Sequence, residues 1–195
     1  MNRSMSEVIS YFHRPRPIGR SFNYRLEERH LVVDTGMKEA EVAYGDIRSA
    51  RLVFEARNLT TGFRTTLTLK SGRTVTMNNL DWRNWLDVRH KNAEYAAFVT
   101  ELLRRAAEAN PDLVCHAGRP PLLWAFTTLV GAATMVGMVA ALGWALMLGF
   151  WTYVLVAAGF MAVFGYQIYG LVFRNKPRIF EASAPPPAVL PDASS

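Results

Sequence analysis

Few residues of this 195-residue chain are of the types that perform catalysis or hold metal ions. The four histidines are His13, His30, His90 and His116. None has a second histidine or a carboxylate at the spacing of a metal site, and the single cysteine, Cys115, excludes an internal disulfide and a thiolate zinc site. The sequence has no glycine-rich phosphate loop, nucleophile elbow or conspicuous carboxylate pair. We therefore expect a protein that is not an enzyme and has no metal and no cofactor. An enzyme or transporter would need a site built jointly with another subunit.

The strongest feature of the sequence is a run without charged side chains, residues 122–173. As one straight helix this run would extend about 78 Å, whereas the apolar core of a bilayer is about 30 Å thick. We therefore predict two membrane spans, at about residues 121–142 and 151–173, with Trp144 and Trp151 in the membrane interface. The alternative is a buried helical hairpin in a soluble protein, which would need a larger covering domain than the rest of the chain supplies.

Positive charges flank the predicted hairpin and are absent from its loop. They are Arg104, Arg105 and Arg119 before it, and Arg174, Lys176 and Arg178 after it. Because Lys and Arg concentrate in cytoplasmic loops, we predict that the N- and C-termini are both cytoplasmic. The N-terminus lacks the apolar region of a secretory signal, which agrees with this orientation. Neither span carries an ionisable residue, which argues against a proton relay or an ion path.

Small residues recur at helical spacing on both predicted spans. On the first span they are Ala133, Gly137 and Ala141, and on the second they are Ala158, Ala162 and Gly165. Such stripes let helix backbones approach closely in lipid. We expect the two spans to pack on each other through them. The alternative is that one stripe binds a helix of a membrane-protein partner or of a second copy.

Before the spans, short alternating segments bounded by turn residues are typical of β-strands. The predicted strands are residues 22–27, 30–34, 39–44, 49–54, 63–70 and 73–78. The last two form a hairpin, because Leu67 and Leu69 alternate with polar residues before a Ser-Gly turn, as Val75 and Met77 do after it. An amphipathic helix is predicted at about residues 93–109, capped by Asn92. The predicted fold class is α+β.

Three stretches together resemble the bacterial pleckstrin-homology-like domains, which often stand beside membrane spans. They are YGDIRSARL, which enters a middle strand, the LTLKSGRTV hairpin, and the closing helix AEYAAFVTELLRRA. The resemblance covers about residues 21–109. It implies a curved antiparallel sheet or barrel closed by one C-terminal helix, and a binding or assembly module at a bacterial inner membrane. Eukaryotic relatives hold phosphoinositides on a basic loop between the first two strands. The corresponding turn here, residues 27–30, is short and half acidic, which argues against such a pocket.

The predicted organisation is a basic arm at 1–20, the β domain at 21–110, a linker at 111–120, the hairpin at 121–173 and a disordered cytoplasmic tail at 174–195. The net charge is +6, and basic residues near a membrane attract anionic headgroups. The candidates for lipid contact are Arg14, Arg16, Arg20, Arg83, Arg119, Arg174, Lys176 and Arg178. We do not expect nucleic acid as a partner, because no aromatic–basic stripe or known module focuses the charge.

Two tryptophans of the β domain, Trp82 and Trp85, stand close together in LDWRNWLDVRHK. We expect one or both to pack beneath the helix, and the alternative is that they enter the membrane interface beside Arg83 and Arg89. For the whole chain we expect a membrane-anchored protein-interaction or assembly module, an accessory subunit of a larger inner-membrane complex. The alternative is that its basic domain senses or binds anionic lipid headgroups.

Overall fold

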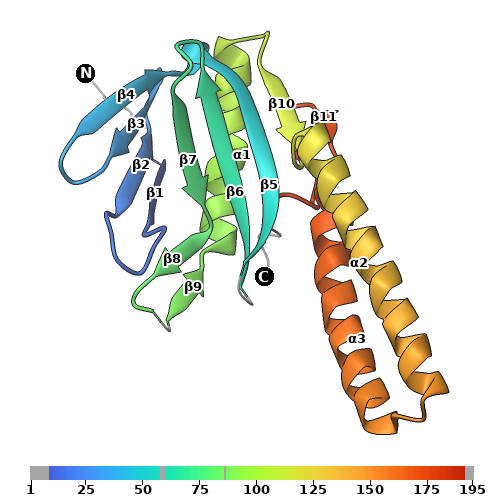
Figure 1. Ribbon diagram of the computed structural model, residues 1–195. Helices are drawn as coiled ribbons and strands as arrows, with labels where there is room; N and C mark the ends of the chain where they lie inside the picture. Colours follow the sequence, from blue (N-terminus) through green and yellow to red (C-terminus); the bar gives the residue numbers. More distant parts are fainter. Residues whose placement is uncertain (1–8, 58–59, 86, 192–195) are drawn as a thin grey trace, which may run out of the picture. The chain divides into compact units, whose positions relative to one another are not determined.

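The computed structural model describes residues 9–57, 60–85 and 87–191 of the chain. The chain divides into two compact units (Figure 1). The sheet domain consists of Met1–Ala117 and Arg178–Ser195, and the helical hairpin is Gly118–Pro177. The α+β class and the two long apolar helices agree with the sequence analysis.

Four antiparallel strands form the first sheet, in the order β1-β2-β3-β4 (Figure 1). They are β1 (Ile9–His13), β2 (Phe22–Leu26), β3 (His30–Asp34) and β4 (Glu39–Ala43). On β2, Tyr24 and Leu26 are buried while their neighbours are partly exposed, which is the alternation of a strand with one core face. Strands β2, β3 and β4 lie where the sequence predicts them. β1 lies inside the segment predicted as a polar arm.

Five strands form the second sheet, in the order β11-β10-β5-β6-β7. They are β5 (Ile47–Arg57), β6 (Thr60–Leu69), β7 (Thr74–Asn78), β10 (Val114–Ala117) and β11 (Arg178–Phe180). A short 3-10 turn, η1 (Tyr44–Asp46), joins β4 to β5, and β8 (Leu80–Trp82) pairs with β9 (Val88–His90) in a separate hairpin. The predicted β6–β7 hairpin is present, with Leu67 and Met77 fully buried and its turn made by Gly72 at a φ of 82°.

The helical hairpin is inserted between two paired strands of the second sheet. β10 pairs in parallel with β5 and antiparallel with β11, and Ala117 lies opposite Arg178. Farther along, Val189 and Leu190 are buried in the core of the sheet domain. The predicted linker therefore contains a strand. The predicted disordered tail is ordered over its described residues, because its apolar side chains find cover on the domain.

The helix α1 (Asn92–Ala109) packs its predicted apolar stripe on the core. The buried side chains of the stripe are Tyr95, Phe98, Val99, Leu102, Leu103 and Ala106. The predicted capping role of Asn92 is wrong: the residue before the helix is Lys91, and the Asn92 side chain instead accepts a hydrogen bond from Asn79 Nδ2, 2.7 Å away. At the other end, Asn110 Nδ2 donates to the Ile47 carbonyl at 2.8 Å, which fastens the helix end to β5.

Tyrosine hydroxyls join the two sheets where no strand pairing does. Tyr11 donates to the carbonyl of Asn78 at 2.7 Å, and Tyr24 donates to the carbonyl of Thr76 at 2.9 Å. Both acceptors belong to β7, the edge strand of the second sheet. Among the described residues the strands therefore form open sheets and not the closed barrel that is one form of the predicted fold.

The exchange Tyr24→Phe tests this junction. It removes one hydroxyl and leaves a β7 carbonyl without that donor, so we expect the sheet domain to lose about 1 kcal/mol of stability. Tyr153→Phe, at an exposed position of the hairpin, is the matched control and should change nothing. Urea unfolding of the full chain in a nonionic detergent measures both. Equal midpoints for the two variants would contradict the role given to Tyr24.

The hairpin consists of α2 (Pro121–Met147) and α3 (Trp151–Phe173), both long and apolar enough to cross a bilayer. In the most apolar 18-residue stretch of each helix, only 6% of α2 and 0% of α3 is buried. The core helix of a soluble protein would be mostly buried. α2 continues five residues past 142, where the first predicted span ends, because glycine within an apolar helix does not by itself end it. The turn falls at Gly149, with a φ of 72°. The two helices pack closely where Gly131 meets Ile168, and Trp124 Nε1 donates to the Val172 carbonyl at 2.8 Å.

Candidate functional site

The predicted basic arm, residues 1–20, is a strand followed by a loop over residues 9–20, and its first eight residues lie outside the described part of the chain. Tyr11 and His13 on β1 are each 1% exposed, so this segment belongs to the core. The loop between the first two strands is therefore residues 14–21, RPRPIGRS, and not the acidic turn at residues 27–30. We call residues 14–21 the arginine loop. The loop between the first two strands therefore carries three arginines and no acidic residue, and is not half acidic as expected.

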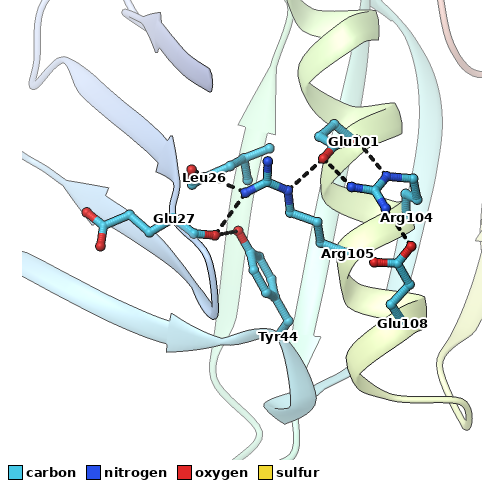
Figure 2. Close-up of polar contacts among 7 residues, drawn as sticks. All are labelled: Leu26, Glu27, Tyr44, Glu101, Arg104, Arg105 and Glu108. Atoms are coloured by element: carbon cyan, nitrogen blue, oxygen red, sulfur yellow. Dashed lines mark hydrogen bonds and ion pairs between the residues drawn. The ribbon is translucent and has the colours of Figure 1, made fainter. Parts of the chain in front are cut away.

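The turn at residues 27–30 has a structural role instead. Figure 2 shows Arg105 reaching from α1 to this turn, where its Nη1 donates to the Glu27 carbonyl at 2.9 Å. Tyr44 donates to the same carbonyl at 2.8 Å, and Arg105 Nε donates to Glu101 at 2.6 Å. Hydrogen bonds from Arg104 and Arg105 lower the pKa of Glu101 to about 2. The network fastens α1 to the first sheet and leaves these groups engaged with one another.

The β8–β9 hairpin lies beside the arginine loop. The Arg14 amide donates to Asp81 Oδ1 at 2.9 Å, and the Trp82 amide donates to the Arg14 carbonyl at 3.0 Å. We call residues 80–85 and 87–90 the tryptophan hairpin. Trp82 is half-buried and Trp85 is 69% exposed, so Trp85 does not pack beneath the helix, and the expectation that one or both do so rests on Trp82 alone. The structure thus brings together six of the predicted site residues: Arg14, Arg16, Arg20, Trp82, Arg83 and Trp85.

The other predicted basic residues lie at the base of the hairpin and on β11. Arg119 donates its amide to the Asn175 carbonyl at 3.1 Å and its Nη1 to Thr127 Oγ1 at 3.4 Å. Next to it, Gly118 has a φ of 78°, and a Cβ there would stand 2.4 Å from the Asn175 carbonyl oxygen. The backbones therefore meet too closely for any residue but glycine. Three further basic residues follow α3: Arg174 is partly exposed, and Lys176 and Arg178 are exposed.

The predicted helix-packing residues divide between two faces. Ala158 and Gly165 are partly covered, and a Cβ on Gly165 would lie 3.8 Å from Met135 of the facing helix. In contrast, Ala162 and the whole first stripe are exposed. That stripe, which we call the α2 stripe, is Ala133, Gly137 and Ala141. At about 100° per residue it lies roughly 200–280° around the helix from Gly131, the glycine that contacts α3 and that the stripe pattern missed.

Both tryptophans predicted for the membrane interface stand near the turn of the hairpin. Trp144 is 71% exposed near the end of α2, and Trp151 is 68% exposed at the start of α3. Large aromatic side chains with a polar ring nitrogen suit the boundary between headgroups and lipid tails. The interface role of Trp144 and Trp151 stays a prediction, and it requires the turn of the hairpin to lie near one surface of a bilayer.

His13 is the most unusual titratable group of the sheet domain. Its ring packs against two aromatic side chains, with its centroid 6.0 Å from that of Phe22 and 5.7 Å from that of Tyr24. Neither ring nitrogen has a hydrogen-bond partner within the described residues. Burial lowers the pKa of His13 to about 4, and Asp81 and the nearby backbone of Leu80, which does not reach hydrogen-bonding geometry, oppose the shift. The imidazole is therefore neutral at neutral pH and part of the aromatic core.

The remaining groups that could do chemistry are not assembled into a site in the described part of the chain. Burial raises the pKa of the Cys115 thiol to about 11, which keeps it protonated and unreactive at neutral pH. Burial and the nearby Arg51 lower the pKa of His116. Within residues 9–57, 60–85 and 87–191, no three His, Cys, Asp or Glu side chains are grouped as they would be around a metal ion.

No family model matches this chain, and no curated protein or solved structure shows significant similarity to it. The resemblance to pleckstrin-homology-like domains is therefore not confirmed by a relative. The description that stands is an α+β sheet domain with a hairpin of two apolar helices.

Proposed function

We propose that this chain is a membrane-anchored, non-catalytic module that binds a protein partner, as an accessory or assembly subunit of a larger complex at a bacterial inner membrane. The observation that carries the proposal is the insertion of the hairpin between β10 and β11. The chain leaves the sheet domain at Ala117 and returns at the directly paired residue Arg178. A domain held through two short connections keeps far less freedom than one on a flexible linker, which suits a module that presents a surface to a neighbour.

Two further features support this proposal. The α2 stripe is exposed and is not used in the contact with α3, and small residues let a partner helix approach closely in lipid. Positive charges at the base of the hairpin, with none in its turn, favour an orientation with both termini in the cytoplasm. In this orientation the sheet domain faces cytoplasmic components of the complex.

Gentle detergent extraction of the tagged chain at native expression level, followed by mass spectrometry of co-purifying proteins, tests the proposal. We expect a membrane protein, or a second copy of this chain, in stoichiometric amount. The exchange Gly137→Leu should reduce its recovery by about tenfold or more, because the added side chain keeps a docked helix away. Ala132→Leu, about 140° around the helix from Gly137 and also exposed, adds a similar volume and should leave recovery unchanged. Recovery of the chain alone, as a monomer, would contradict the proposal.

A further inference from the structure

The arginine loop and the tryptophan hairpin form one continuous end of the sheet domain. They are joined by the Arg14–Asp81 and Trp82–Arg14 hydrogen bonds of 2.9 and 3.0 Å. In Figure 1 the loop between β1 and β2 and the hairpin of β8 and β9 lie at the same end of the domain. Any surface that touches one of them can therefore touch the other.

The arginine loop and the tryptophan hairpin each expose one large apolar side chain at the tip, the part farthest from the strands. Ile18 of the arginine loop is 72% exposed and Trp85 of the tryptophan hairpin is 69% exposed. Core side chains of the same domain such as Tyr24 and Leu67 are at most 1% exposed, whereas Met37 and Ile179 are as exposed as Ile18 and Trp85 but lie outside these two segments. Two such tips next to each other are unfavourable in water and favourable in the interface of a membrane, where tryptophan in particular accumulates.

The charges around the tips are mostly positive. The two segments carry the five arginines Arg14, Arg16, Arg20, Arg83 and Arg89. Their two acidic residues are Asp81, which accepts the Arg14 amide, and Asp87. A surface with apolar tips and a surrounding excess of arginine complements anionic headgroups above an apolar layer. A nucleic acid would use the charge but would leave Ile18 in water.

The connection to the hairpin favours a membrane as the occupant of this surface. Only residues 118–120 separate the end of β10 from the start of α2, a span of about 10 Å at most. β10 runs parallel to β5. Because β5 pairs antiparallel with β6, and β6 pairs antiparallel with β7, β7 also runs in the direction of β10. β7 leads into β8. The strand that passes the chain to the first apolar helix thus points to the end of the domain that carries the two tips.

We propose that the arginine loop and the tryptophan hairpin are a second membrane contact, in which Ile18 and Trp85 enter the interface of an anionic bilayer and the surrounding arginines bind its headgroups. The contact involves lipid alone. It therefore goes beyond the proposed partner binding and can be tested on the purified chain, whatever the fate of that proposal.

The test uses the full chain in nanodiscs, with Cys115→Ser and a single spin label introduced by Ile18→Cys or Trp85→Cys. Accessibility of the label to a water-soluble nickel relaxant is compared with its accessibility to oxygen. The matched control is Ser71→Cys, exposed in the β6–β7 turn at the opposite end of the sheet. In phosphatidylcholine with one third phosphatidylglycerol, we expect nickel accessibility at positions 18 and 85 to fall several-fold relative to pure phosphatidylcholine, and that at position 71 to stay constant.

Two further conditions examine the role of charge. Raising the salt to 0.5 M shortens the screening length to about 4 Å and should restore nickel accessibility at positions 18 and 85. The triple exchange Arg16→Gln, Arg20→Gln and Arg83→Gln should do the same at low salt, and all three side chains are exposed. Labels at 18 and 85 that are equally open to nickel in both lipids would overturn the proposal. Immersion that is the same in both lipids and insensitive to salt would also overturn it.

Discussion

Replacing Val189 with aspartate should destabilise the sheet domain by about 3–5 kcal/mol, because a charge without a partner would be placed in an apolar core. Val189 is 1% exposed and belongs to the same buried cluster as Phe98 and Leu102 of α1. The side chain comes from the segment that the composition marks as a disordered tail. A large effect from so distant a position is therefore a direct measure of how firmly this segment belongs to the domain.

Hydrogen exchange of the α1 amides in the full chain reports on this domain separately from the hairpin. We expect α1 of Val189→Asp to exchange at least a hundredfold faster than α1 of the native chain, since about 1.4 kcal/mol corresponds to a factor of ten in the opening equilibrium. Ala184→Asp places the same charge at an exposed position of the same segment and should leave the exchange unchanged. If both variants behaved like the native chain, residues 183–191 would not be part of the core.

The strands that the sequence predicts and the strands that it misses differ in length and in the location of their partners. β6 and β7 alternate clearly and pair across a local turn, so Leu67 and Met77 reveal both register and core face. β10 and β11 have four and three residues, too few for a periodic signal. They pair with each other across the whole hairpin, a contact that no local pattern contains.

β1 was missed for a chemical reason. Its core positions hold Tyr11 and His13, which read as polar in a sequence, and their burial depends on rings from other elements. Tyr11 lies 5.6 Å from Phe98 of α1, ring centroid to ring centroid, and Tyr24 of β2 lies 5.7 Å from His13. Without β1, the loop that follows it cannot be recognised as a loop between two strands.

The candidate surface was therefore predictable by residue type and not by position. Arginines and tryptophans were identified as possible lipid contacts from their chemistry alone. That the arginine loop lies beside the tryptophan hairpin depends on hydrogen bonds such as Arg14 to Asp81, between residues 67 positions apart. Similarly, helical spacing identified the α2 stripe, but only packing against α3 shows that Gly131 and not Gly137 makes the internal contact.

His13 should make the stability of the sheet domain depend on pH. Its pKa is about 4 in the folded chain, below the value of 6.5 for an exposed imidazole. Above pH 6.5 the ring is neutral in both states and stability is complete. As the pH falls toward 4, the unfolded chain takes up a proton that the folded chain excludes, so the free energy of unfolding decreases. This difference in pKa between the folded and the unfolded chain corresponds to about 3 kcal/mol of folding stability. That stability is lost between about pH 6.5 and 4, and the contribution of His13 does not change further below that range.

The exchange His13→Phe isolates this contribution, because phenylalanine suits a position stacked against Phe22 and Tyr24 and takes up no proton. Urea unfolding of the full chain in a nonionic detergent, at pH 7, 6, 5 and 4, gives the free energy of unfolding of both proteins. Carboxylates that are stabilised in the fold, such as Glu101, affect both alike. The advantage of the variant should therefore grow by about 3 kcal/mol from pH 7 to pH 4.

A matched control separates burial from the mere loss of a histidine. His90 is exposed on β9, and His90→Phe should give a pH profile parallel to that of the native chain. Parallel profiles for His13→Phe as well would mean that the ring of His13 reaches water or a hydrogen-bond acceptor in solution. Divergence for His13 alone would establish that β1 is held in the core by a histidine that must stay neutral. Because β1 leads directly into the arginine loop, acid would then loosen the same end of the domain that we propose to contact the membrane.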